Sequence, residues 1–391
     1  MVRVFPAGEP DETRKRLAFL GGTGEGLEAF LRELRALVVA VPVDRNDRSE
    51  PWSGRLKSLV DAKGIPHLRA VSHILLTISS EKQVEALQAE FPEETLLERI
   101  SVSLKNYLNN CFQLLIPGGY IDLRGPPILM GIVNVTPDSF SDGGSFRSAE
   151  DAIERGLAME EAGAAILDIG GESTRPGSKP VPAGEELRRV IPVIRGLAGK
   201  SKTVLSVDTT KAGVAREAAG AGARIINDTS AFSDDPGMAE TIRESGCAVV
   251  LMHRRGKPET MQQSPHYGSL FDELLEELSG RVEAAVSSGI DRERILVDPG
   301  IGFGKRAGDN LALHRHLAEL RVLGRPIVFG PSRKSFIGAL TGSPAPERRF
   351  GTAAAVAAAV LSGAHVLRVH DVKEMREVVQ VAAAIRGAAE C

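Results

Sequence analysis

The sequence contains little cysteine and no long apolar run. Its three cysteines, Cys111, Cys247 and Cys391, lie far apart and show no C-x-x-C spacing. That distribution argues against a zinc knuckle or a disulfide framework and favours a reduced, cytoplasmic compartment. The chain has no charge-free run of 18 apolar residues, and its first residues lack the apolar core of a signal peptide. We therefore expect a soluble protein with no membrane partner.

An excess of charge of one sign is also missing. The formal net charge is -3, with 25% charged residues, which gives no sign of a nucleic-acid partner. An apolar content of 42% is ordinary for a globular protein and excludes a disordered or fibrous class. At 391 residues the chain is longer than one average domain, so we expect two domains or one large barrel with an extension.

From about residue 126 onward the sequence repeats short apolar strands and segments with helical spacing. Strands are expected at 128–134, 165–171, 203–209, 224–228, 248–253, 295–298, 326–330 and 365–370. Helices are expected between them, among others at 149–164, 184–200 and 269–289. Eight such units in about 265 residues predict an α/β fold of the (β/α)8 TIM-barrel type. The rival is a doubly wound open sheet, which rarely needs eight strands.

Two segments precede the predicted barrel. Residues 112–127 are typical of a β-hairpin around a Pro-Gly-Gly turn, placed to cover the bottom of the barrel. Residues 1–110 have an α/β pattern of their own and predict a smaller N-terminal extension domain. The barrel with its hairpin then occupies residues 111–391.

Within the extension, strands are expected at 17–20, 37–43 and 73–79, and helices at 25–36 and 81–90. Its turn GGTGEG (21–26), with Asp44 ending the next expected strand, is partly like a dinucleotide-binding fingerprint. The spacing misses the G-x-G-x-x-G that close helix packing requires, so a structural turn is favoured over a nucleotide site.

Every expected barrel strand ends in a polar residue. These residues are Asn134, Asp168, Asp208, Asn227, His253, Asp298, Ser332 with Arg333 and Lys334, and Arg368 with His370. A single such residue is as readily a cap of the following helix. Together they face one mouth, where the active site of this fold lies, and each unpaired charge there costs on the order of several kcal/mol in desolvation. A ligand with matching donors and charges is the simpler explanation.

The signs of these charges suggest two halves of the mouth. Asp208, Asn227 and Asp298 suit a flat heterocycle with adjacent N–H donors, whereas Arg368 and His370 suit an oxyanion. Arg175, after the second strand, would add a donor to the second half. The loops after strands seven and eight are the usual phosphate site of the fold. The pattern predicts a heterocycle that carries a phosphate or diphosphate.

The glycines of DPGIGFGK (298–305) allow two interpretations. They permit the backbone to approach a ligand, or let Phe303 lean over the mouth. Alternatively, they merely form a tight turn.

Seven motifs together resemble the dihydropteroate synthase family of folate biosynthesis. They are MGIVNVTPDSFSDGG (130–144), DIGGESTRPG (168–177), SVDT (206–209), IND (226–228), DPGIGFGK, SRKS (332–335) and RVHD (368–371). The resemblance covers about residues 112–391 and leaves the first 110 without a family. It implies a transferase that condenses p-aminobenzoate with (7,8-dihydropterin-6-yl)methyl diphosphate to give 7,8-dihydropteroate and diphosphate. The family that it resembles is a target of sulfonamides.

The resemblance also implies residue roles in the pterin and diphosphate sites. Asp208, Asn227, Asp298 and Lys334 would hold the pterin, with Asp298 taking the 2-amino and ring N–H donors and Lys334 reaching the ring carbonyl. Arg368 and His370 would hold the diphosphate with Asn134, whose side chain would be an oxygen ligand of Mg²⁺. Arg368, His370, Lys334 and Asp208 are thus the expected catalytic residues.

For p-aminobenzoate, Ser335 and the helix that it begins would receive the carboxylate. Thr174 and Arg175 lie on the second loop, and Pro176 and Phe303 would supply apolar walls. The first and second loops are expected to close over the mouth.

Three alternatives use the same barrel. A methyltetrahydrofolate:corrinoid methyltransferase shares the Asp/Asn cradle but needs no diphosphate site, so SRKS, ESTRPG and RVHD together count against it. A catalytically inactive scaffold would have lost site residues, and none is missing. A second folate-pathway activity in residues 1–110 is not favoured, because that segment shows no acidic metal cluster or P-loop.

Family members usually pair, so a homodimer is expected. The Ala-rich segment 352–360 either forms the dimer face or packs on strand eight.

Overall fold

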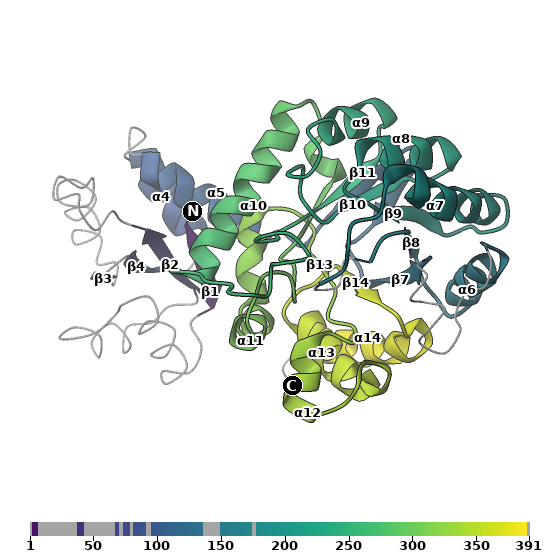
Figure 1. The fold of residues 1–391 in the computed structure, drawn as a ribbon. Coiled ribbons are helices and arrows are strands. Elements are labelled where there is room, and N and C mark those ends of the chain that lie inside the picture. Colours follow the sequence, from purple (N-terminus) through teal and green to yellow (C-terminus); the bar gives the residue numbers. More distant parts are fainter. Residues whose placement is uncertain are drawn as a thin grey trace. The chain divides into compact units, whose positions relative to one another are not determined.

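The structure is a computed structural model that describes residues 2–6, 37–42, 67–69, 73–78, 81–90, 95–135, 149–173 and 177–388 (Figure 1). The chain divides into two compact units. The first comprises Met1–Asn109 with Ala318–Gly324, and the second comprises Asn110–Leu317 with Arg325–Cys391. The short segment 318–324 thus belongs with the N-terminal unit although it lies far along the sequence.

The described residues of the first unit form an antiparallel sheet of order β1-β2-β4-β3 and the helices α4 and α5. Its elements are β1 (Arg3–Pro6), β2 (Leu37–Pro42), β3 (His67–Arg69), β4 (His73–Ile78), α4 (Glu81–Glu90) and α5 (Thr95–Leu108). The strands expected at 37–43 and 73–79 and the helix expected at 81–90 are confirmed. The strand expected at 17–20, the helix expected at 25–36, the turn 21–26 and Asp44 lie outside the described residues.

The second unit contains a parallel sheet of order β12-β11-β10-β9-β8-β7-β14-β13. A parallel bridge between Val297 and Ile327 joins its two ends, so the sheet closes into the predicted (β/α)8 barrel. The strands are β7 (Ile128–Asn134), β8 (Ile166–Gly170), β9 (Val204–Asp208), β10 (Ile225–Asp228), β11 (Ala248–Met252), β12 (Ile295–Asp298), β13 (Val328–Phe329) and β14 (Val366–Val369). The expected strand 326–330 is the one most shortened, because Pro326 has no N–H to donate to a ladder.

Helices surround this sheet in Figure 1. They are α6 (Ala149–Glu161), α7 (Ala183–Ala198), α8 (Ala212–Ala221), α9 (Met238–Ser245), α10 (Leu270–Ser287), α11 (Ala307–Arg315), α12 (Ser335–Thr341), α13 (Arg349–Leu361) and α14 (Val372–Gly387). The helices expected at 149–164, 184–200 and 269–289 are confirmed within a few residues. Among the described residues, no helix combines the length and the apolarity that a membrane crossing needs.

The predicted hairpin consists of β5 (Gln113–Ile116) and β6 (Gly119–Asp122), paired antiparallel. Phe112, Leu114 and Leu123 form one buried cluster with residues near the starts of the barrel strands, including Met130 and Ile225. Each such side chain contributes about 1.5–3 kcal/mol relative to an exposed one. The hairpin therefore covers the bottom of the barrel, as expected, and leaves the opposite end for a site.

Candidate active site

A fully buried carboxylate, Asp168 on β8, is the centre of the hydrogen-bond network at the mouth. Asp168 Oδ1 accepts a hydrogen bond from Ser206 Oγ at 2.6 Å. Its Oδ2 accepts from Asn227 Nδ2 at 2.9 Å and from Arg368 Nε at 2.6 Å. These partners come from β9, β10 and β14, so one carboxylate orients side chains from three other strands. Sequence reasoning placed Asp168 at a strand end but assigned it no role.

Arg368 also pairs with Asp208, the last residue of β9. Arg368 Nη2 lies 2.7 Å from Asp208 Oδ2. Asp208 Oδ1 is buried and accepts no hydrogen bond from the described residues. Burial raises the pKa of Asp208 to about 7, and Asp168 adds to the increase while Arg368 opposes it. Asp208 thus has an acceptor oxygen available to a ligand and a proton affinity near neutrality.

This pairing corrects the expected division of the mouth into an acidic and a basic half. Burial lowers the pKa of Arg368, but the charges of Asp168 and Asp208 raise it more, so the guanidinium stays protonated. The physical reason is that β14, β7, β8 and β9 are consecutive strands of one closed barrel. A buried guanidinium in that interior needs carboxylates as partners.

Asp298 ends β12 and begins the glycine-rich turn. It is 6% exposed, and its Oδ1 accepts a hydrogen bond from Gly300 N at 2.7 Å. Burial raises its pKa, against which Lys334 and Arg368 act. A Cβ on Gly300 would lie 1.9 Å from the carbonyl oxygen of His253, and one on Gly304 would lie 2.2 Å from that of Arg255. The tight-turn interpretation of these glycines therefore accounts for them.

Phe303, at the centre of that turn, is buried against Met252 and Met261. The ammonium of Lys334 lies 4.1 Å from the centroid of its ring, within the range of a cation–π contact. The structure therefore brings Phe303 and Lys334 together, although they come from different strand ends. The two methionines were missed, since nothing in the sequence places Met261 near the turn. Ser335 begins α12 and is exposed.

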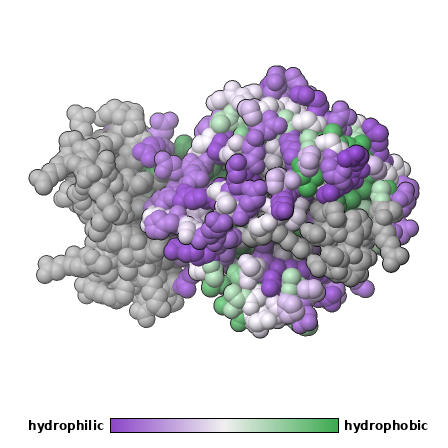
Figure 2. Space-filling view, in the orientation of Figure 1, coloured by the Kyte–Doolittle hydropathy of each residue, from purple (hydrophilic) through white to green (hydrophobic). Residues whose placement is uncertain are grey.

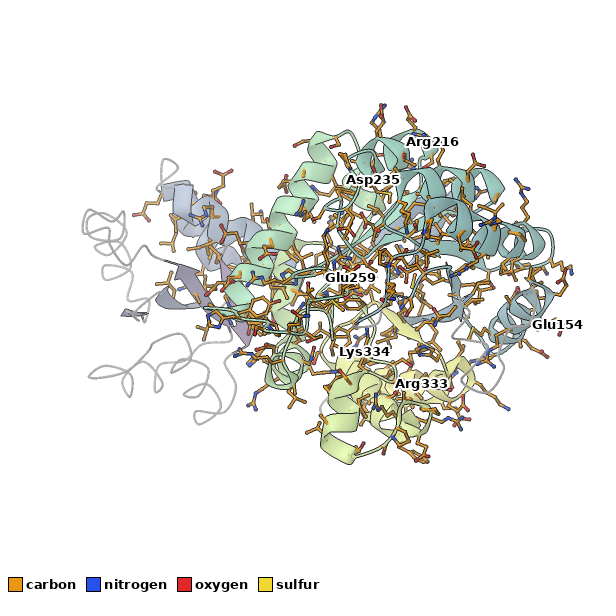
Figure 3. All side chains as sticks on the ribbon, in the orientation of Figure 1. Glu154, Arg216, Asp235, Glu259, Arg333 and Lys334 are labelled. Carbon is orange, nitrogen blue, oxygen red and sulfur yellow. The ribbon has the colours of Figure 1, made fainter. Side chains whose placement is uncertain are left out.

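The loops after β13 and β14 are tied to each other by side chains. Ser332 Oγ lies 2.9 Å from His370 Nδ1 and accepts a hydrogen bond from His370 N at 3.2 Å. Arg333 donates to both carboxylate oxygens of Asp371, at 3.1 and 2.6 Å. Arg333, beside Lys334 in Figure 3, has a backbone φ of 57°, a conformation that residues other than glycine rarely adopt. These contacts orient the segment that carries Lys334 and Ser335.

Thr174, Arg175, Pro176 and the expected first loop, 136–144, lie outside the described residues. The base of the second loop is described. Glu172 Oε2 accepts from Val181 N at 3.1 Å and from Lys211 Nζ at 2.5 Å. Gly177 N donates to Pro258 O at 3.0 Å. Both ends of that loop are therefore anchored.

The expected metal ligand, Asn134, is half-buried at the end of β7. A Cβ added to Gly170 on the neighbouring strand would lie 3.7 Å from Asn134 Oδ1. The glycine thus leaves space beside this oxygen. Within the described ranges, no three His, Cys, Asp or Glu side chains form a group that could hold a metal ion. A single amide oxygen therefore fits Mg²⁺ bound mainly by phosphate and water, and it does not fit a site made entirely of protein ligands.

Comparisons with known proteins agree with this geometry. Residues 130–370 match the family model described as pterin binding enzyme. The dihydropteroate synthase of Escherichia coli K12 is 45% identical over 278 residues, which are 71% of this chain and 98% of that protein. A dihydropteroate synthase of Xanthomonas albilineans, solved with 4-aminobenzoic acid, has a TM-score of 0.67 and 45% identity, covering 71% of this chain and 100% of that one. The structure with 7,8-dihydropteroate has a TM-score of 0.64, 43% identity and the same coverage.

Proposed function

The chain belongs to the dihydropteroate synthase family, and on that premise we propose how its barrel residues carry out the family's reaction. It is a transferase that condenses p-aminobenzoate with (7,8-dihydropterin-6-yl)methyl diphosphate to give 7,8-dihydropteroate and diphosphate. The observation that carries the residue roles is the buried Asp208 oxygen, which lacks a hydrogen-bond donor among the described residues and lies in an otherwise satisfied network.

The pterin is held by the acceptors of the mouth. Asp298 accepts the 2-amino and ring N–H groups, and Asp208 Oδ1 accepts a further ring N–H. Asn227, oriented by Asp168 at 2.9 Å, lines the same cradle. Lys334 donates to the ring carbonyl. The support for this assignment is chemical, because buried carboxylates and a fixed amide match a heterocycle whose edge carries adjacent donors.

Departure of the diphosphate is assisted by the side chains of Arg368 and His370. Cleavage of the C–O bond builds negative charge on the leaving oxygens, which Arg368 and His370 stabilise. The same step leaves positive character on the pterin methylene, and the carboxylate of Asp208 offsets it. The aromatic amine attacks directly, so no side chain has to act as a nucleophile.

The p-aminobenzoate site lies beside Phe303 and Lys334. Ser335 donates its hydroxyl to the benzoate carboxylate, and Phe303 forms an apolar wall. Thr174, Arg175 and Pro176 complete the site from the second loop. The described base of that loop is held by the hydrogen bonds of Glu172 with Val181 N and of Gly177 N with Pro258 O.

Asn134 would hold Mg²⁺ through its side-chain oxygen, and the ion would supply positive charge that stabilises the leaving diphosphate. The space beside its Oδ1, left by Gly170, supports this role. Cys111 and Cys247 are free thiols, which agrees with a reducing, cytoplasmic compartment.

A homodimer is the oligomeric state that we propose, formed by α12, α13 and α14. The exposed large apolar residues there are Phe350, Leu340, Leu361, Val381 and Ile385, with Phe350 88% exposed. Green atoms gather in Figure 2 where α12 and α13 lie in Figure 1. The opposite face of α13, including Ala355 and Ala359, is buried, so that part of the Ala-rich helix packs inward. Sedimentation of Phe350→Glu as a monomer would support the assignment.

The site is tested by measuring diphosphate release and dihydropteroate formation, with and without p-aminobenzoate. Asp298→Ala should lose most of both activities, because the pterin then loses its main acceptor. Glu154→Ala, on the exposed face of α6, is the matched control and should act like wild type (Figure 3). Equal activity in wild type and Asp298→Ala would overturn the assigned pterin site.

A further inference from the structure

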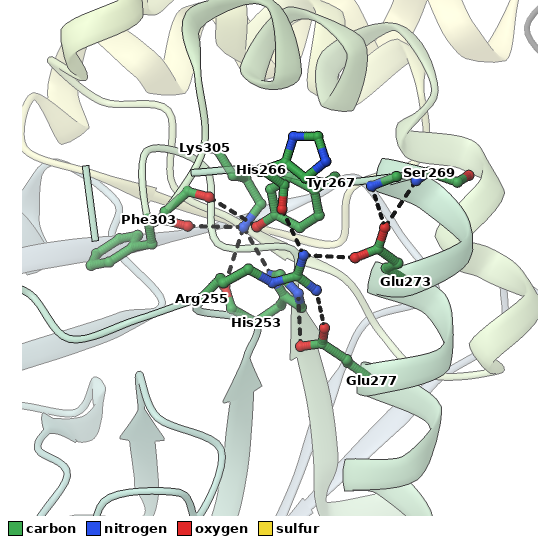
Figure 4. Close-up of polar contacts among 11 residues, drawn as sticks. His253, Arg255, His266, Tyr267, Ser269, Glu273, Glu277, Phe303 and Lys305 are labelled. Atoms are coloured by element: carbon green, nitrogen blue, oxygen red, sulfur yellow. Dashed lines mark hydrogen bonds and ion pairs between the residues drawn. The ribbon is translucent and has the colours of Figure 1, made fainter. Parts of the chain in front are cut away.

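A buried lysine, Lys305, closes the glycine-rich turn. Lys305 is 2% exposed. The ammonium donates to Phe303 O at 3.1 Å and to His253 O at 3.4 Å, and it lies 2.9 Å from His253 Nδ1 (Figure 4). No carboxylate among the described residues forms a salt bridge with it. A buried charge with only neutral acceptors costs free energy, so we expect a structural role of Lys305 that offsets this cost.

The contacts of Lys305 are part of a larger support of the turn. Three consecutive backbone carbonyls each accept one side-chain hydrogen bond. Gln262 Nε2 donates to Gly302 O at 2.7 Å, Lys305 Nζ donates to Phe303 O, and Tyr267 Oη donates to Gly304 O at 2.9 Å. Gln262 and Tyr267 both lie on the connection between β11 and α10. The backbone on either side of Phe303 is therefore held by side chains and not only by its own turn.

Carboxylates of α10 hold the residues that support the turn. His253 Nε2 lies 3.1 Å from Glu277 Oε2, although its alignment is poor for a hydrogen bond. Because Nδ1 faces the Lys305 ammonium, the network assigns the ring proton to Nε2, toward Glu277. Arg255 pairs with Glu273 at 2.6 Å and with Glu277, and lies 4.1 Å from the centroid of the Tyr267 ring. The turn is thus connected to a helix with 18 residues.

We propose that Lys305 is a positioning residue, which with Gln262 and Tyr267 holds Phe303 in place as the wall of the p-aminobenzoate site. The inference rests on the proposed role of Phe303 in that site. Lys305 itself is buried, and its ammonium contacts Phe303 O and His253. Its loss should therefore impair use of p-aminobenzoate more than binding of the pterin diphosphate.

The charge of Lys305 adds a pH dependence. Burial lowers the pKa of Lys305 to about 7, while Asp298, Glu277 and Asp309 raise it and Arg255 lowers it. Burial and Lys305 lower the pKa of His253 to about 4, so the imidazole is neutral near pH 7. An ammonium has three donors for its three acceptors, whereas a neutral amine has two. The support should therefore weaken as the pH rises above about 7.

The experiment compares steady-state kinetics of the full chain with Lys305→Met, Tyr267→Phe and Gln262→Ala. Lys200→Met, exposed after α7, is the control. We expect Lys305→Met to raise KM for p-aminobenzoate by about ten-fold or more, since small displacements of positioning groups have effects of this order. KM for the pterin diphosphate should change less than about two-fold by the same reasoning. Tyr267→Phe and Gln262→Ala should shift the p-aminobenzoate KM in the same direction by less. The rise of that KM with pH should be flattened in Lys305→Met.

Amide hydrogen exchange of residues 300–304 without substrates gives a readout independent of activity. Faster exchange in Lys305→Met and Tyr267→Phe than in the Lys200→Met control supports the inference. Unchanged exchange together with an unchanged p-aminobenzoate KM overturns it. A rise confined to the pterin KM also overturns it and points to Asp298. If Lys305→Met does not fold, the two milder variants decide the matter. Absence of dihydropteroate formation by wild type would refute the proposed function but would leave the exchange result intact.

Discussion

Replacing Asp168 by asparagine removes the negative charge at the centre of the mouth and keeps the hydrogen bonds made there. Asparagine has the same shape, and its oxygen can accept from Asn227 and Arg368 at the positions now 2.9 and 2.6 Å away. Its amide N–H can donate to the Ser206 hydroxyl, which accepts as well as donates. All three contacts keep a partner, and one negative charge beside Arg368 is lost.

The magnitude follows from the partners that remain. A hydrogen bond to a charged group stabilises by about 1.5–3 kcal/mol and a neutral one by about 1 kcal/mol. Arg368 keeps Asp208 at 2.7 Å, so we expect Asp168→Asn to lower the free energy of unfolding by about 1–3 kcal/mol. Asp168→Leu leaves the same donors unpaired in the interior and should cost about 3–5 kcal/mol.

The same variant has a pH signature. The charge of Asp168 raises the pKa of Asp208, so its removal should lower that pKa from about 7. The midpoint of the pH dependence of kcat/KM should then move to lower pH. Urea unfolding followed by circular dichroism measures the stability, and turnover across neutral pH measures the midpoint. Equal destabilisation by Asn and Leu, or a midpoint that stays in place, would refute the role of the Asp168 charge.

Three further predictions concern the turn, the loops and pH. Gly300→Ala should be strongly destabilising in thermal unfolding, because its Cβ would lie 1.9 Å from the carbonyl oxygen of His253. Gly118, with φ of 86°, has open space around it, so Gly118→Ala should show only the backbone cost of about 1–2 kcal/mol. Arg333→Met and Asp371→Asn should each lower kcat/KM, and their effects should be less than additive in a double-mutant cycle because the two side chains act as one pair. Burial raises the folded-state pKa of Asp208 above its unfolded value, so the folded state binds more protons and the free energy of unfolding should fall as the pH rises from about 4 to 7. Asp208→Asn should remove that part of the slope in pH-dependent unfolding. An unchanged slope would contradict the prediction.

The barrel could be predicted because its signals are local. Short apolar runs separated by segments of helical spacing report strands and helices one at a time, and their number limits the architecture. The strand Ile128–Asn134 and the helix Glu81–Glu90 have the expected bounds. The start of β13 was missed because Pro326 has no N–H for a ladder and the N–H of Ile327 donates to the side chain of His365, which only the packed structure shows.

The candidate site was predicted as a set of residues but not as a network. Strand ends are visible in sequence, so Asp208, Asn227, Asp298, Lys334, Arg368 and His370 could be assigned to one mouth. Their pairing was not visible: Arg368 was grouped with the donors for an oxyanion, and its guanidinium in fact pairs with Asp208 at 2.7 Å. The importance of Asp168 and the contact of Met261 with Phe303 likewise emerged only from the packed structure.

The sequence by itself determined the kind of fold and the motifs that identify its family, because both depend on residues close together in the chain. Only the tertiary structure decided which buried charges neutralise one another. Arg368 and Asp168 are 200 residues apart, and their contact exists only once the sheet has closed. In that interior an unpaired charge is costly, so the closed sheet decides which carboxylates pair with Arg368 and leaves the Oδ1 of Asp208 for a ligand.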